Sequence, residues 1–122
     1  MTMRAKPKRI ALTQADLDRL EKELRDLALS EGTNLFPELD ELSSVTVIDD
    51  IDIDEGSLEV TKETNGDLNV DGVVNVYVTL NYGDKRDPAA FGDSFPGHFS
   101  ALLSDAGMKL KSTSVDTSSF YK

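Results

Sequence analysis

Residues 73–82 alternate between apolar and polar side chains over the whole length of the segment. A period of two is typical of a β-strand that turns one face to a core and the other to solvent. We therefore expect a central strand here, in a sheet with one covered face. The side chains on its core face would be Val74, Val76, Val78, Leu80 and Tyr82.

A second alternating segment, residues 45–54, predicts another half-buried strand. Its apolar side chains fall on odd positions and its polar ones on even positions, except that Ile48 and Asp49 exchange places. This exchange predicts a β-bulge, or a break between two short strands. The apolar set is Val45, Val47, Ile51 and Ile53, and the polar set is Thr46, Asp50, Asp52 and Asp54.

Turn signals divide the following segments into short strands. A strand that begins at Leu58 is expected to end at the turn Asn65-Gly66. Residues 68–70 are then expected to form a short piece that turns again at Asp71-Gly72.

Residues 83–97 contain several glycines and prolines, which predicts a long connecting loop. A last hairpin is expected after it, with strands over residues 98–104 and 108–115.

Leucines recur at spacings of three and four between Thr13 and Gly32, which predicts an amphipathic helix. Thr13 can cap its first turn, and Gly32 lies past its end. The leucine stripe is Leu17, Leu20, Leu24 and Leu27, and the expected surface ion pairs are Asp18 with Lys22 and Glu21 with Arg25. Packing on the chain's own sheet is favoured over a coiled-coil seam, because the stripe lasts only two heptads.

Together these segments predict an α+β domain over residues 13–122, preceded by a flexible basic arm over residues 1–12. The expected architecture is an N-terminal amphipathic helix packed on one face of an antiparallel sheet of about five strands. A short helical turn opened by Pro37 would lie between the helix and the sheet.

The residue types exclude several classes of function. The chain has no cysteine, which excludes disulfide scaffolds and thiolate chemistry, and its single histidine leaves no His pair for a catalytic metal. We therefore predict no metal, no cofactor and no catalytic residues. No apolar run reaches the roughly 20 residues of a membrane helix, so a cytoplasmic protein without membrane contact is expected.

Acidic residues dominate the charge. The chain carries 13 basic and 23 acidic residues, a net charge of −10. Between Glu38 and Asp71 there are twelve acidic residues and one basic residue, Lys62. Such a surface attracts a basic protein surface and repels nucleic-acid phosphates. The row Asp50, Asp52 and Asp54 is the first candidate for partner binding.

Aromatic residues near the predicted loop are the second candidate. Phe91, Phe95 and Phe99 lie within nine residues of one another. Exposed on a loop, Phe91 and Phe95 could anchor a partner, since buried rings supply much interface energy. The alternative is that these rings close the open end of their own sheet.

Two further patterns are candidates for a calcium site and for a catalytic histidine. Residues 67–75 resemble an EF-hand or dockerin calcium loop at nine positions, but Val78 stands where the closing carboxylate is needed. A hairpin turned by Asp71-Gly72 is the favoured interpretation. His98 has Asp93 and Ser94 near it in sequence, and a structural role is favoured for this histidine.

These observations predict a non-enzymatic, acidic protein-binding module, such as an inhibitor, an immunity-type protein or an adaptor, that engages a basic partner surface. The acidic body is not expected to bind nucleic acid directly. The alternatives are a nucleic-acid mimic that inhibits a DNA- or RNA-binding protein, and a calcium-binding domain.

Overall fold

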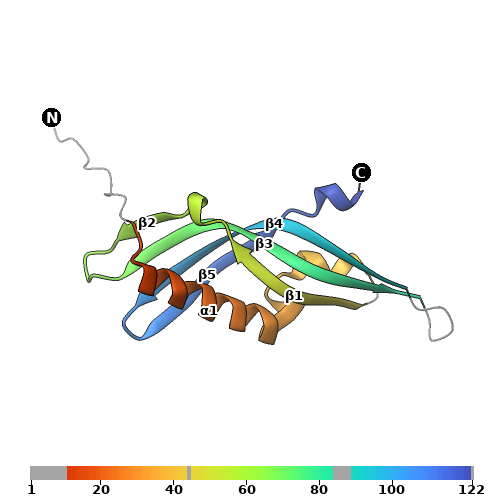
Figure 1. Cartoon of the computed structure of the whole chain (residues 1–122), viewed down its shortest axis with the longest axis horizontal. Helices are drawn as coiled ribbons and strands as arrows, with labels where there is room; N and C mark the ends of the chain where they lie inside the picture. Colours follow the sequence, from red (N-terminus) through yellow and green to blue (C-terminus); the bar gives the residue numbers. More distant parts are fainter. Residues whose placement is uncertain (1–10, 44, 84–88, 122) are drawn as a thin grey trace.

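The computed structural model describes residues 11–43, 45–83 and 89–121. One α-helix, α1 (Gln14–Glu31), packs against a five-stranded antiparallel sheet, as Figure 1 shows. The strands are β1 (Val45–Ile53), β2 (Glu59–Lys62), β3 (Leu68–Tyr82), β4 (Ala89–Ser104) and β5 (Gly107–Val115). Short 3-10 helices are η1 (Gly32–Asn34), η2 (Pro37–Glu41), η3 (Glu55–Ser57) and η4 (Ser118–Tyr121). The predicted α+β class is confirmed.

The sheet is built around two long strands. Its order is β1-β3-β4-β5, and β2 pairs with β3 along the same edge as β1. The 3-10 helix η3 fills the gap between β1 and β2: the backbone N–H of Val73 donates to the Ser57 hydroxyl at 2.8 Å, and the N–H of Asp54 donates to the Val73 carbonyl at 3.0 Å. The edge of β3 is thereby hydrogen-bonded where the two partner strands are interrupted.

The helix has the ends that its sequence predicts. The Thr13 hydroxyl accepts the N–H of Asp16 at 3.1 Å, and Gly32 closes the other end with a φ of 58°. Such a positive φ favours glycine. Leu20 and Leu24 are fully buried, while Ala28 is buried where Leu27 was expected.

The core lies between α1 and the sheet face that carries the even-numbered side chains of β3. Both η1 and η2 pack on β1 from the helix side, and the Thr113 hydroxyl of β5 donates to the Leu35 carbonyl at 2.7 Å. The largest fully buried side chains are Phe36, Phe95, Leu20, Leu24, Leu39, Ile51, Leu80 and Leu103.

The turn predicted at Asp71-Gly72 is wrong, because β3 runs unbroken through it. Gly72 is buried, and a Cβ there would stand 2.7 Å from Cδ2 of Leu58 and 3.1 Å from Cε1 of Phe99. The glycine is needed for close packing in a strand. The turn predicted at Asn65-Gly66 is confirmed, with Gly66 at a φ of 94°.

The long loop predicted over residues 83–97 is also wrong where the structure describes it. Residues 84–88 lie outside the described residues, and β4 already begins at Ala89. Pro96 is compatible with this strand because β5 pairs with β4 only from Gly97 onward. At this end of β5, the N–H of Asp116 still donates to the Pro96 carbonyl at 2.8 Å, and beyond it β4 is an edge among the described residues, where the missing N–H of a proline is tolerated.

The predicted bulge in β1 is confirmed between Ile48 and Asp50. It reverses the alternation, so Ile48 is buried and Val45 and Val47 are exposed. The expectation that both valines face the core is therefore wrong. A one-residue shift moves side chains to the opposite face of a sheet.

Of the predicted arm over residues 1–12, residues 1–10 lie outside the described residues, and Leu12 packs against the core. Within the described part of the chain, no helix is both long enough and apolar enough to cross a membrane.

Candidate functional site

The sheet has a second face, which we call the outer face. It carries the odd-numbered side chains of β3, which are exposed or half-buried, while the even-numbered ones from Val70 to Leu80 are buried. Residues paired directly across an antiparallel sheet share a face. The register therefore adds His98 of β4, opposite Val73, and Glu59 of β2, opposite Asp71, to the outer face.

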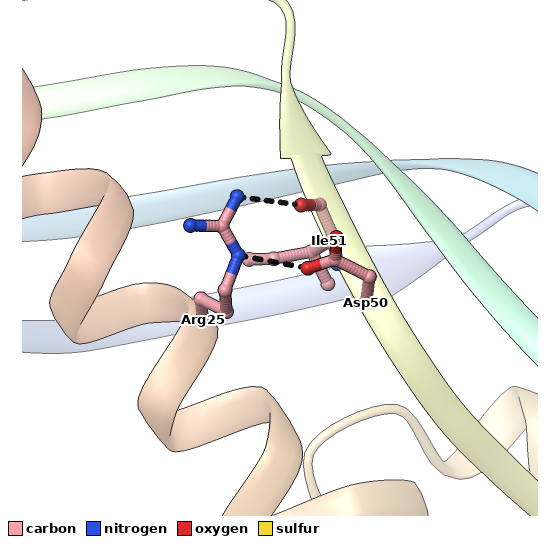
Figure 2. Close-up of polar contacts among 3 residues, drawn as sticks. All are labelled: Arg25, Asp50 and Ile51. Carbon is pink, nitrogen blue, oxygen red and sulfur yellow. Dashed lines mark hydrogen bonds and ion pairs between the residues drawn. The ribbon is translucent and has the colours of Figure 1, made fainter.

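The predicted acidic row does not act as one surface, because one member is held by the helix. Arg25 of α1 donates from Nε to the Asp50 carboxylate at 2.7 Å and from a terminal nitrogen to the Ile51 carbonyl at 3.3 Å (Figure 2). The hydrogen bond from Arg25 lowers the pKa of Asp50 below its ordinary value, and the N–H of Ile51 adds to this effect. Asp50 therefore joins β1 to α1.

The other two aspartates differ again. Asp54 accepts the N–H of Gly56 at 3.1 Å and so caps η3. Asp52 is exposed and lies opposite Asn75 on the outer face. The role of Asp52 in partner binding stays a prediction.

The phenylalanines separate into two environments. Phe95 is 1 % exposed and Phe99 is 2 % exposed, so both rings belong to the core. Phe91 is 58 % exposed and makes an edge-to-face contact with Tyr82, at 5.9 Å between ring centroids. A partner could reach the ring of Phe91 but not that of Phe95 in this structure.

The residues of the calcium-loop pattern belong to a turn and a strand. Asn69 donates from its amide to the Glu63 carboxylate and accepts from Nζ of Lys111 at 3.2 Å. Among the described residues, no group of three His, Cys, Asp or Glu side chains is arranged to hold a metal ion.

An open pocket of about 260 Å³ lies on the outer face beside the η3 gap. Its ionisable side chains are those of Glu59, Asp71 and His98, and the other lining residues are Ser57, Gly72 and Val73. His98 on β4 and Asp71 on β3 occupy diagonal positions. Diagonal neighbours on antiparallel strands are generally about 7–8 Å apart. The pocket thus brings together an imidazole and two carboxylates from three strands.

Sequence reasoning paired His98 with Asp93 and Ser94 and missed this grouping. Asp93 falls on the other parity of β4, opposite Val78, and Ser94 lies four residues along the strand from His98. The β3–β4 register was the missing information. The alternation of β3 could have indicated that Asp71 shares a face with Asn75, had the Asp71-Gly72 turn not been assumed.

A cation lies on the same face. Nζ of Lys111 reaches Asn69 from the bulge of β5 opposite Ser100 and Ala101. Asn69 precedes Asp71 on the same side of β3 by two residues, a rise of about 6.5–7 Å. The ammonium group of Lys111 is therefore held at Asn69, one position along the outer face of β3 from Asp71.

A family model described as a predicted pPIWI-associating nuclease matches residues 11–121. Comparison with curated proteins and with solved structures gives no significant match. The family overturns the predicted function: a non-enzymatic acidic binding module, with a nucleic-acid mimic or a calcium-binding domain as alternatives, is wrong. Its name conflicts with the prediction that the protein is not an enzyme, and it implies a protein partner of some kind. The chain belongs to the family of predicted pPIWI-associating nucleases.

Proposed function

We propose that this chain takes part in nucleic-acid cleavage in association with a pPIWI protein. The observation that carries the proposal is the family match over residues 11–121, which spans every helix and strand of the fold. The pocket on the outer face supports it, because an imidazole and a carboxylate are the usual groups for moving protons in a cleavage reaction.

The charge of the chain suggests what the partner supplies. A protein with a net charge of −10 is repelled by nucleic-acid phosphates over distances of about 10 Å at 0.1 M salt. The pPIWI partner would therefore hold the nucleic acid and present it to this chain. Association of the two proteins would come before efficient cleavage.

The partner would bind with a basic surface to the acidic segment between Glu38 and Asp71. Asp52, exposed on β1, and the exposed ring of Phe91 on β4 are the residues we expect at this interface. Charged groups at an interface mainly accelerate encounter, while a desolvated aromatic ring contributes more to affinity.

Co-expression of the chain with a pPIWI protein tests the proposal. We expect the two to purify as one complex that cleaves a labelled single-stranded oligonucleotide faster than either protein alone at equal concentration. The pPIWI protein alone gives the background rate. A failure to associate, or a complex no faster than that background, would contradict the proposal.

A further inference from the structure

We infer that the pocket lined by Asp71 and His98 is an RNA-cleaving site that works by proton transfer, with Asp71 as general base and His98 as general acid. The inference rests on the proposed function and names the residues and the substrate class. It is carried by the placement of an exposed imidazole and an exposed carboxylate on either side of one pocket.

The spacing suits a phosphodiester. Diagonal positions on neighbouring antiparallel strands are about 7–8 Å apart, so both side chains can reach a group lying between them. In phosphoryl transfer, the attacking and leaving oxygens stand roughly in line on opposite sides of the phosphorus. A base on one side and an acid on the other match that arrangement.

The position is fixed by the fold. Val73 lies opposite His98 and two residues after Asp71, and it is tied to Ser57 and Asp54 through its own N–H and carbonyl. Gly72 lets the side chains of Leu58 and Phe99 pack closely against β3, since a Cβ on Gly72 would meet both. Catalytic side chains on paired strands are held more precisely than those on loops.

The reaction balances without a further reagent. The Asp71 carboxylate takes the proton of a ribose 2′-hydroxyl, and the 2′-oxygen forms a bond to the adjacent phosphorus. The bond from phosphorus to the 5′-oxygen breaks, and the protonated His98 imidazole gives its proton to that leaving oxygen. The products are a 2′,3′-cyclic phosphate and a 5′-hydroxyl. DNA lacks the 2′-hydroxyl, so RNA is the substrate class.

Lys111 would bind substrate beside this pair. Its ammonium group, held by Asn69, can contact a phosphate of the RNA next to the one being cleaved. Glu59, paired with Asp71 on β2, also lines the pocket, and its charge would repel phosphates from the β2 side.

The test uses the full chain in complex with its pPIWI protein, in buffer containing EDTA, on a labelled single-stranded RNA and on DNA of the same sequence. We expect cleavage of RNA alone, with 2′,3′-cyclic phosphate ends identified by mass spectrometry. Asp71→Asn and His98→Ala should each slow single-turnover cleavage by about 100-fold or more. Lys111→Gln should raise KM more than it lowers kcat.

The matched control is Asp40→Asn, which removes the same charge from an exposed residue of η2. It should cleave like the unchanged chain. Melting temperatures of all variants establish that each is folded. A complex that cleaves RNA while Asp71→Asn and His98→Ala keep full rate would overturn the site and leave the proposed function standing. Equal cleavage of DNA, or products with 3′-hydroxyl ends, would also overturn it. Cleavage by the unchanged complex in Mg²⁺ but not in EDTA would also overturn the site, whereas no cleavage in either buffer would contradict the proposed function.

Discussion

Two leucines of α1, Leu20 and Leu24, fill the space between the helix and the sheet with no exposed surface. Removing a buried leucine side chain loses its transfer free energy and leaves a cavity, at a cost of about 2–5 kcal/mol. We expect Leu24→Ala to lower the free energy of unfolding in urea by this amount. Leu29→Ala is the control, because Leu29 is 49 % exposed on the same helix and should change little. Equal, small effects of both changes would mean that α1 does not pack on the sheet.

Gly97 of β4 is a position where a larger side chain, and not a smaller one, is expected to destabilise the fold, because its surroundings leave no room for a Cβ atom. A Cβ on Gly97 would stand 2.5 Å from the backbone carbonyl oxygen of Ser114. Because that oxygen belongs to β5, the strand itself has to move. Gly97→Ala should destabilise by about 1–3 kcal/mol in thermal melts. Gly92→Ala, where a Cβ meets nothing within 4 Å, should not.

These two cases differ in what the sequence reveals. The leucine stripe is a local pattern, so Leu20 and Leu24 could be assigned to the core directly. The need for Gly97 arises from Ser114, seventeen residues further on and on another strand. Only the pairing of strands makes such a contact visible, and the glycine was therefore interpreted as part of a loop.

Sequence patterns did not predict the ion pair that joins α1 to β1. The predicted ion pair of Arg25 with Glu21 would have stayed within the helix, but Arg25 bonds to Asp50 on β1. Lys22 likewise bonds to Asp26 at 2.9 Å. Helical spacing identifies candidate partners on the same helix, while a partner on another element depends on how the elements pack.

The Arg25–Asp50 pair makes the junction of helix and sheet sensitive to acid. The pKa of Asp50 is lowered in the folded state, so its contribution to stability is present at neutral pH and is lost as the pH falls through that lowered value. Both side chains are partly exposed, at 41 % and 54 %, so the contribution is about 0.2–1 kcal/mol.

We expect Asp50→Asn to lower the free energy of unfolding at pH 7 by this amount and to have a smaller effect near pH 2, because protonation of the carboxylate weakens the pair. The measurement is urea unfolding at the two pH values, with Asp40→Asn as the control for the loss of one charge. An equal loss at both pH values would indicate that Asp50 acts through packing and not through its charge.

Strand periodicity was reliable where the alternation ran without glycine, proline or a bulge, and before the bulge of β1 it assigned Val45 and Val47 to the wrong face. It identified the core face of β3 from Val74 to Leu80 and the bulge of β1. It failed at Gly72 and at residues 89–97, because glycine and proline were interpreted as chain breakers. Inside a sheet these residues also mark close packing or an edge. The pocket with Asp71 and His98 was missed for the same reason. The predicted turn at Asp71-Gly72 and the predicted loop over residues 83–97 removed the pairing of β3 with β4 that brings the two side chains together.

Across the whole chain, the charge is the property that the sequence gives most directly, and its meaning changes once the family is known. An acidic surface alone suggested a binding module. In a member of the family of predicted pPIWI-associating nucleases, the same surface favours the proposed division of labour, in which one protein holds the nucleic acid and the other reaches it through the association.

That division predicts how the complex responds to salt and to charge reversal. Asp52 is exposed on the outer face of β1, so Asp52→Lys should leave the melting temperature unchanged while slowing association with the pPIWI protein. Raising NaCl from about 0.1 to about 1 M shortens the screening length from about 10 to about 3 Å, which should slow association of the unchanged chain and narrow its difference from the variant. Surface plasmon resonance measures both rates. An association rate that neither salt nor Asp52→Lys alters would mean that the partner does not meet this chain through a basic surface, and Phe91→Ala would then test the exposed ring as the main contact.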